Sequence, residues 1–117
     1  MKRHLETGRT GEDQAASFLI SIGYTILERN RRYSLGEIDI LACDRDILVL
    51  VEVKTGRTGK YGYAFERVGP KKKQKLRLLA RRLSQDFPRQ QIRIDLIDVD
   101  PVTKKILHIP AAIDVVQ

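Results

Sequence analysis

Four charged residues interrupt a pair of apolar strands in the stretch GEIDILACDRDILVLVEVKT, residues 36–55. The stretch predicts a β-hairpin, because two runs rich in Val, Ile and Leu flank a short polar segment. Acidic side chains that adjoin continuous apolar runs become partly buried when the strands pack, and such groups need compensation. The charged residues near the outer ends of the two strands are Glu37, Asp39, Glu52 and Lys54.

The position of the turn decides which of these charges meet. If Arg45 and Asp46 are the two central residues of a tight turn, Asp39 lies opposite Glu52. Side chains alternate between the faces of a strand, so all four charges then share one face. We expect Glu37 to have a structural role, as the ion-pair partner of Lys54, Arg31 or Arg32. The opposite face is predicted to carry apolar side chains only: Ile38, Ile40, Val49, Val51 and Val53.

Two directly opposed carboxylates, with Cβ atoms ~4.5–5.5 Å apart, repel unless a proton, a cationic side chain or a metal ion intervenes. Lys54 can reach one of the two. Carboxylate oxygens together with water suit Mg²⁺ or Mn²⁺. Zinc is disfavoured, because His4, His108 and Cys43 lack the spacing of a zinc site. The alternative is a salt-bridged patch at the end of the sheet.

The positive charge of the chain is concentrated directly after this hairpin. The formal net charge is +7, and residues 54–82 contain eleven Lys or Arg and one acid, Glu66. A concentrated basic segment favours a polyanion, with nucleic acid ahead of an anionic membrane. The alternative is a solvated helix that only aids solubility. An acidic metal site beside a basic surface suits phosphodiester hydrolysis, because the metal activates water and the basic surface holds the backbone.

Size and cysteine content narrow the class of protein. The 117 residues are in the usual range for one domain, so we predict a single domain over residues 1–117. One cysteine allows no intramolecular disulfide and fits a reducing compartment. The N-terminal segment lacks the apolar core of a signal peptide, and no apolar run approaches the ~20 residues that span a bilayer. We therefore expect a cytoplasmic protein with no membrane partner.

Periodicity and turn signals predict an α/β fold, a mixed sheet with packed helices in the order α-β-β-β-α-β-β. The first helix is predicted to begin after Thr10, to bury Ile22 on its apolar face and to end at Gly23. Pro70 suits the first turn of a second helix. The predicted strands are residues 24–32, 37–43, 47–54, 91–99 and 106–109, and the second helix runs to about Gln85 with Leu76, Leu79, Ala80 and Leu83 on its apolar face.

The order of these motifs resembles the PD-(D/E)XK nucleases, the superfamily with the restriction-endonuclease-like fold. Asp39, followed after a turn by Glu52-Val53-Lys54, is similar to the signature of that superfamily, and the predicted element order matches its core. The wider pattern resembles the bacterial YraN-type family, which is related to archaeal Holliday-junction resolvases. Its motifs are GEDQAASFLISIGYTILERN at 11–30, GEIDIL at 36–41, VEVKTG at 51–56, KQKL at 73–76 and RIDLIDV at 93–99.

The resemblance implies a metal-dependent endonuclease that acts on DNA, with branched or junction DNA among the candidate substrates. Asp39 and Glu52 would be ligands of Mg²⁺ or Mn²⁺, with the Val53 carbonyl as a third. Lys54 would orient or activate the attacking water, and Glu12 on the first helix would complete the metal site. One alternative is a nucleic-acid-binding module that keeps the nuclease fold without cutting. Another is an interaction protein with a purely electrostatic carboxylate cluster.

Nucleic-acid contacts are expected from the segment after the hairpin and from the second helix. Gly56 stands where many members of the resembled family have an arginine, which moves the expected phosphate contact to Arg57. Tyr61 can stack on an unpaired base, or it can pack under its loop. Symmetric cutting of two strands would call for a homodimer. The expected contacts, with DNA favoured over RNA, are Arg57, Lys60, Tyr61, Lys71, Lys72, Lys73, Gln74 and Lys75.

Overall fold

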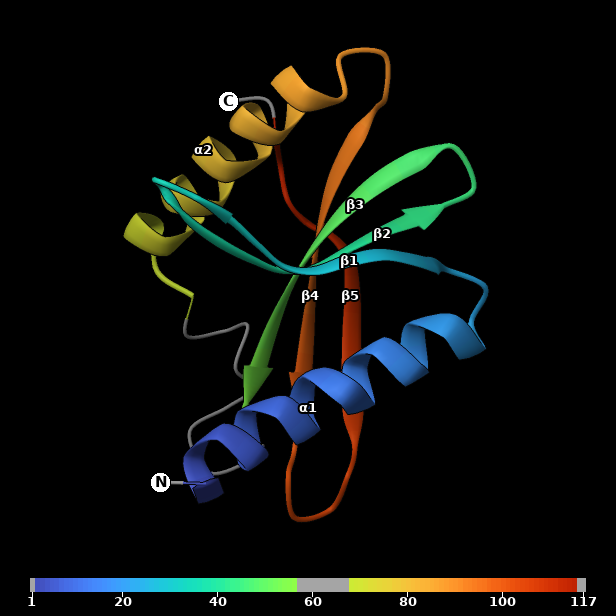
Figure 1. Cartoon of the computed structure of the whole chain (residues 1–117), viewed down its shortest axis with the longest axis vertical. Helices are drawn as coiled ribbons and strands as arrows, with labels where there is room; N and C mark the ends of the chain where they lie inside the picture. The colour runs from blue at the N-terminus through green and yellow to red at the C-terminus, as the bar shows by residue number, and fades with distance from the viewer. Residues whose placement is uncertain (1, 57–67, 116–117) are drawn as a thin grey trace.

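The computed structural model describes residues 2–56 and 68–115, with side chains described from Gly11 onward. Within those residues the fold is mixed α/β, and the elements follow the predicted order (Figure 1). They are α1 (Lys2–Ser21), β1 (Thr25–Tyr33), β2 (Gly36–Asp44), β3 (Ile47–Thr55), α2 (Pro70–Asp86), β4 (Ile92–Val99) and β5 (Ile106–Ile113).

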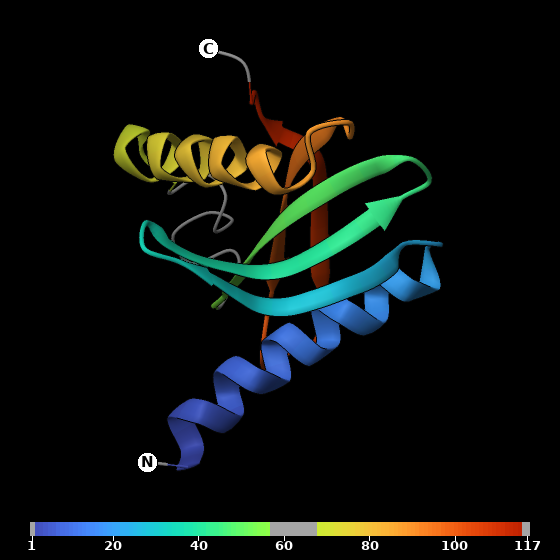
Figure 2. The same cartoon turned by 45° about the horizontal axis from the view of Figure 1, so that its top comes forward.

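The described strands form one mixed sheet in the order β1-β2-β3-β4-β5. Neighbouring strands are antiparallel except β3 and β4, which are parallel. α1 lies on one face of the sheet and α2 on the other (Figure 2), so each helix closes its own hydrophobic core. The α2-side core includes Leu41, Leu50, Leu79 and Leu83, and the α1-side core includes Leu19, Ile40, Val51 and Ile97.

The hairpin between β2 and β3 has the predicted register as far as Ile40, but the predicted pairing of Asp39 with Glu52 is wrong, because the ladder ends at the pair Ile40–Val51. Asp44 pairs with Ile47, and the ladder continues to the pair Ile40–Val51. The prediction that Ile38 shares a face with Ile40 is wrong, because Ile38 packs in the α2-side core and Ile40 in the α1-side core. Beyond Ile40 the ladder of β2 continues with β1, and a two-stranded ribbon twists more strongly than a wider sheet.

This twist brings the turn between β1 and β2 beneath the N-terminal part of α2 (Figure 2). Gly36 lies at that turn with φ 152°, in the region that favours glycine. A Cβ atom on Gly36 would lie 2.8 Å from Cε of Lys75, so the glycine also gives the lysine stem room to lie over the turn.

The end of α1 is as predicted, but its start is not. The helix begins at Lys2, so a start after Thr10 is wrong. A capping residue does not fix a helix start when the preceding residues, such as Lys2, favour helix. Gly23 has φ 100° and donates its N–H to the Ile20 carbonyl at 3.0 Å, which is a glycine-terminated helix end. Ile22 lies beyond the last turn and is 47% exposed, so its predicted burial is wrong.

The other end of the sheet also extends further than predicted. β5 continues to Ile113 instead of ending at residue 109. Pro110 does not stop it, because β5 is an edge strand, where a missing N–H can face away from the ladder. The pairing with β4 shifts between Ile94 and Leu96, which indicates a bulge at this point.

α2 begins with Pro70 in its first turn and ends near the predicted residue. Gly69 precedes it, and no side-chain hydrogen bond caps this end of the helix. In the described residues, neither helix combines the length and the apolar character that crossing a membrane requires. The four predicted apolar residues of α2 are all buried: Leu76, Leu79, Ala80 and Leu83.

Candidate carboxylate and lysine site

The site begins where β2 and β3 part. Their ladder ends at the pair Ile40–Val51, one residue before Asp39 and Glu52. In place of a backbone bond, the N–H of Val53 donates to the Asp39 carboxylate at 2.9 Å. The side chain of Asp39 therefore fills the opening between the two strands and is attached to the strand that carries Glu52.

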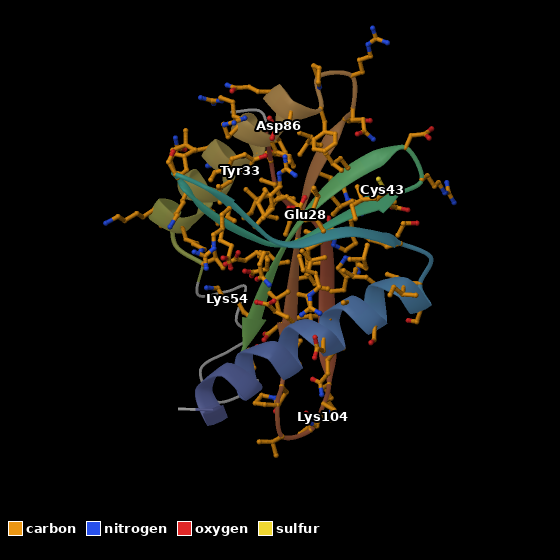
Figure 3. The ribbon with its side chains drawn as sticks, in the orientation of Figure 1. Glu28, Tyr33, Cys43, Lys54, Asp86 and Lys104 are labelled. Atoms are coloured by element: carbon orange, nitrogen blue, oxygen red, sulfur yellow. The ribbon has the colours of Figure 1, made fainter. Side chains whose placement is uncertain are left out.

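Glu52 is almost fully buried, at 5% exposure, and it is paired with two lysines. Nζ of Lys54, on the same strand, lies 3.5 Å from its Oε2 atom. Nζ of Lys72, from α2, lies 3.0 Å from that same oxygen. Figure 3 labels Lys54 near the end of β3, in the region between the two helices. The predicted neighbourhood of Glu52 and Lys54 is present, and Lys72 joins it from another element.

Asp39 has a different environment from Glu52. Burial is the largest cause that raises the pKa of Asp39, the negative charge of Glu52 adds to it, and the hydrogen bond from Val53 opposes both, so that the pKa lies at about 7. The charges of Glu12 and Glu37 add to the rise. Asp39 is therefore a carboxylate whose ionised form needs a nearby cation, as expected for an acid in a functional site.

Glu12 reaches the site because α1 packs closely against the end of β3. A Cβ atom on Gly11 would lie 2.4 Å from Oγ1 of Thr55, so only glycine allows this approach without a shift. Glu12 lies 3.4 Å from Nη2 of Arg29, which gives the carboxylate a cationic partner. Its charge acts on Asp39, so the structure brings Glu12 to the edge of the predicted site.

Asn30 is a residue of this region that the sequence analysis missed. It has φ 56° within β1, in the left-handed region that asparagine tolerates better than most residues. By the β1–β2 register it lies opposite Asp39. In the amide orientation that satisfies both neighbours, its nitrogen donates to Glu12 at 3.3 Å and to Glu37 at 3.1 Å. Asn30 thus bridges two carboxylates beside a third.

The remaining predicted residues divide into three groups. Glu37 pairs with Arg32 at 3.1 Å, which confirms its expected role as an ion-pair partner. Cys43 is free and packs at the edge of the α2-side core. Lys71, Lys73, Gln74 and Lys75 are exposed on α2, whereas Arg57, Lys60 and Tyr61 lie outside the described residues.

Asp39 and Glu52 are the two residues that could act together as oxygen ligands of a divalent cation. Glu52 is buried and Asp39 partly buried, and burial together with the charge of Glu52 raises the pKa of Asp39, so a cation beside Asp39 would favour its ionised form. In the described part of the chain, no three His, Cys, Asp or Glu side chains are grouped closely enough to hold a metal alone. Two carboxylates that leave positions for water and a phosphate oxygen suit Mg²⁺ or Mn²⁺.

A second polar cluster lies elsewhere on the sheet and was also missed. Asp95 is fully buried on β4 and accepts hydrogen bonds from Arg93 at 2.8 Å and from Tyr24 at 3.1 Å. His108 Nε2 lies 2.8 Å from the same carboxylate, and Arg93 also donates to Asp44. Burial alone would raise the pKa of Asp95, but hydrogen bonds from His108, Arg93 and the Ala111 N–H lower it to about 2. The groups that bond to Asp95 in this cluster all come from the same chain, so we assign the cluster to the stability of the fold.

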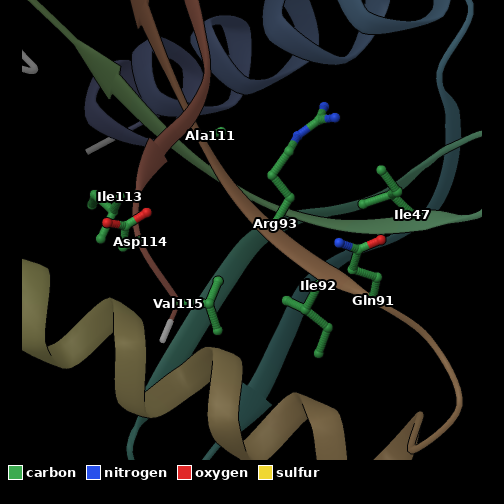
Figure 4. A pocket seen from close by; sticks show the side chains of 8 residues that line it. All are labelled: Ile47, Gln91, Ile92, Arg93, Ala111, Ile113, Asp114 and Val115. Atoms are coloured by element: carbon green, nitrogen blue, oxygen red, sulfur yellow. The ribbon is translucent and has the colours of Figure 1, made fainter. Parts of the chain in front are cut away.

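A hollow of about 310 Å³ adjoins this cluster (Figure 4). Ile92 and Val115 contribute apolar side chains, and the guanidinium of Arg93 points away from them (Figure 4). The charge of Arg93 is already shared between Asp95 and Asp44. The hollow therefore offers mainly apolar surface, and the carboxylate and lysine site is the better candidate for chemistry.

The fold and the site define a small α/β protein whose mixed sheet ends in a cluster of carboxylates and lysines. The chain belongs to the family described as Uncharacterised protein family UPF0102, which matches residues 11–99. That range includes Glu12, Asp39, Glu52, Lys54 and Lys72.

Relatives of the same family are found in several organisms. A UPF0102 protein of Persephonella marina is 41% identical over 109 residues, which covers 92% of this chain and 92% of the relative. A UPF0102 protein of Pseudarthrobacter chlorophenolicus is 45% identical over 95 residues, or 81% of this chain and 70% of the relative. A UPF0102 protein of Symbiobacterium thermophilum is 43% identical over 98 residues, which covers 80% of this chain and 81% of the relative. These similarities establish the family, and the chemistry rests on the geometry of the site.

Proposed function

We propose that this protein is a Mg²⁺- or Mn²⁺-dependent endonuclease-like enzyme of the PD-(D/E)XK type that hydrolyses phosphodiester bonds in DNA. The observation that carries the proposal is the opening between β2 and β3. There Asp39 is held by the Val53 N–H with a raised pKa, beside a buried Glu52 with lysine partners. A buried acidic pair at a strand end, next to a basic helix, is suited to bind a metal ion and a phosphate together.

Each residue of the site has a role in this proposal. Asp39 and Glu52 would hold the divalent ion, with the Val53 carbonyl and Glu12 as further candidate ligands. When bound, the ion would polarise the attacking water and neutralise charge on the phosphate. Lys54 would orient that water and stabilise the negative charge that develops on the phosphoryl oxygens.

The exposed lysines of α2 would hold the DNA backbone. Lys71, Lys73 and Lys75 are exposed, and the stem of Lys75 lies over the turn between β1 and β2. Contacts of this kind are electrostatic and do not depend on base sequence, so binding should weaken as the salt concentration rises. The sequence-based assignments of Arg57, Lys60, Tyr61 and Gln74 to DNA contact remain part of the proposal. Symmetric cutting of two strands would further require a homodimer.

A second candidate function is a nucleic-acid-binding module that does not cut. One observation favours it: Lys54 and Lys72 both contact Glu52, so their ammonium groups can balance its charge. In that case the acidic pair would only position the lysines, and binding would not depend on divalent ions.

Calorimetric titration with Mn²⁺ tests the metal site directly. The parent protein should bind Mn²⁺, and Asp39→Ala should not, because a ligand is removed. A panel of duplex, single-stranded, flap and four-way-junction DNA, incubated with Mg²⁺ or Mn²⁺, then tests cleavage. Cutting should be lost in Glu52→Gln, and cutting that survives this change would point to a contaminating enzyme. Binding to DNA without cutting would favour the second candidate.

A further inference from the structure

Lys72 holds the shortest ion pair of Glu52 although it comes from a different element. Its Nζ lies 3.0 Å from Glu52 Oε2, whereas Nζ of Lys54, two residues along the same strand, lies at 3.5 Å. The side chain of Lys72 is 35% exposed and that of Glu52 is 7% exposed, so water shields this pair only in part. The exposed neighbours Lys71 and Lys73 belong to the same turn of α2 and point outward.

The shared oxygen creates a competition. A divalent ion that bridged Asp39 and Glu52 would need an oxygen of Glu52, and both lysines contact one of the two, Oε2, so their positive charges oppose a cation at this carboxylate. Lys54 is fixed near Glu52 because the two residues share a strand face. Lys72 reaches Glu52 from α2 through a flexible four-carbon stem. Lys72 can therefore withdraw without any change in the sheet, and it is the lysine that metal binding would displace.

The charges of the group support this exchange. Both ammonium groups contact Glu52 and none of the described contacts joins either of them to Asp39, although the formal charges of the two ionised carboxylates and the two lysines sum to zero. A divalent ion adds two positive charges, and the group then attracts an anion. A released Lys72 would lie beside the ion on the side from which the lysines of α2 meet a phosphate backbone.

We propose that Lys72 is an exchange residue, which pairs with Glu52 when no metal ion is bound. When a divalent ion binds Glu52, Lys72 is released from this ion pair and then binds the DNA phosphate next to the ion. This inference rests on the proposed function. It makes metal and DNA binding cooperative, because each ligand favours the state in which Lys72 has left Glu52. Linkage requires that the coupling be equal in both directions.

Lys72→Met tests the exchange, because methionine keeps an unbranched stem and removes the charge. Without DNA, the variant should bind Mn²⁺ about fivefold more tightly than the parent in calorimetry, since a partly shielded competitor is gone. Lys72→Arg keeps a cation and should bind Mn²⁺ like the parent. Lys73→Met, a matched loss of charge on the same turn, should also leave Mn²⁺ affinity unchanged.

The second measurement is the anisotropy of a labelled duplex with phosphorothioate linkages, titrated with protein in Mn²⁺ and in EDTA. The parent should bind the duplex more tightly in Mn²⁺ than in EDTA. In Lys72→Met this increase in DNA affinity should be about tenfold smaller. If the parent binds Mn²⁺ and Lys72→Met binds it with equal or weaker affinity, the proposed exchange of Lys72 is wrong, but the proposed metal site is supported. If the parent binds no Mn²⁺, the proposed function fails and the exchange fails with it.

Discussion

The backbone N–H of Val53 donates a hydrogen bond to the carboxylate of Asp39 at 2.9 Å, where β2 and β3 stop pairing. A side chain thus takes the place of a strand partner, and the strands separate without leaving that N–H unsatisfied. The opening also places an acid where burial and Glu52 both disfavour its charge. The site is therefore expected to lower the stability of the metal-free fold.

Asp39→Asn should make the metal-free protein more stable at pH 8. The folded pKa of Asp39, about 7, lies above its ordinary value of 3.8, so the folded state binds the extra proton between these values. Stability contributed by that proton is lost as the pH rises from about 4 to about 7. Asparagine keeps an acceptor for Val53 and removes the charge, so the gain should reach at most roughly 4 kcal/mol.

Urea unfolding in EDTA at pH 4 and pH 8 measures this effect. The parent and the variant should differ little at pH 4 and most at pH 8. Mn²⁺ at pH 8 should stabilise the parent and not the variant, because ligand binding to the folded state adds to its stability. An asparagine variant that is less stable than the parent at pH 8 would show that the charge of Asp39 is already compensated.

Asn30 should position the acidic residues through its amide. Substitution by glycine should be tolerated better at this position than substitution by alanine. Asn30→Gly keeps the left-handed backbone, and Asn30→Ala strains it, so the alanine variant should be less stable by about 1 kcal/mol. Both variants lose the bridge between Glu12 and Glu37. Mn²⁺ affinity should fall in both by on the order of tenfold, the usual effect of removing a group that orients ligands.

The two effects are measured separately, because stability depends on the backbone and metal affinity on the amide. Chemical denaturation measures the stability, and calorimetric titration measures the Mn²⁺ affinity. Equal stability of the two variants would argue against strain at φ 56°. Unchanged Mn²⁺ affinity in Asn30→Gly would mean that the amide does not hold the carboxylates in place.

The sequence predicted the hairpin register well, because a polar turn between β-branched runs leaves few ways to bury both strands. Asp44 and Ile47 pair as expected. The alternation rule failed at Ile38, since it assumes a continuous ladder and the ladder with β3 ends at Ile40. Where a strand changes partners depends on twist and on packing against α2, which no local pattern records.

The contacts of the site were predictable only within one hairpin. Asp39, Glu52 and Lys54 lie on two strands joined by a short turn, so their spacing carries the geometry. Lys72 meets Glu52 only because α2 packs across the sheet. Composition placed Lys72 in a basic helix, and nothing in the run KKKQK distinguishes it from its neighbours.

Arg93→Met should destabilise the fold strongly at neutral pH, because it removes a cation from the buried carboxylate of Asp95. Loss of one partner of a buried pair costs about 3–5 kcal/mol. Because hydrogen bonds hold the folded pKa of Asp95 near 2, its stabilising contribution is present above about pH 4 and is lost as the pH falls toward 2. The difference between variant and parent should therefore shrink in acid.

Guanidinium unfolding of the single and double variants checks this pair. Asp95→Asn combined with Arg93→Met should be more stable at pH 7 than Arg93→Met alone, since no bare charge remains. Additive effects of the two substitutions would show that the residues do not interact.

Gly11→Ala should destabilise the protein, although alanine is the better helix former by about 1 kcal/mol. The new Cβ would lie 2.4 Å from Oγ1 of Thr55 and 3.4 Å from its Cγ2. To relieve this crowding, Thr55 must leave its present rotamer or α1 must move away from β3. Overpacking of this kind costs about 1–3 kcal/mol, and the movement would carry Glu12 away from Asp39.

A double-mutant cycle with Thr55→Ala isolates the contact. Thr55→Ala alone should change the free energy of unfolding little, because Thr55 is exposed. In the double variant the two clashing atoms are gone, so the helix propensity of alanine should restore or exceed the parent stability. A Gly11→Ala variant that is at least as stable as the parent would mean that α1 does not pack closely on β3. Close packing of α1 on β3 would then not explain how Glu12 comes near Asp39.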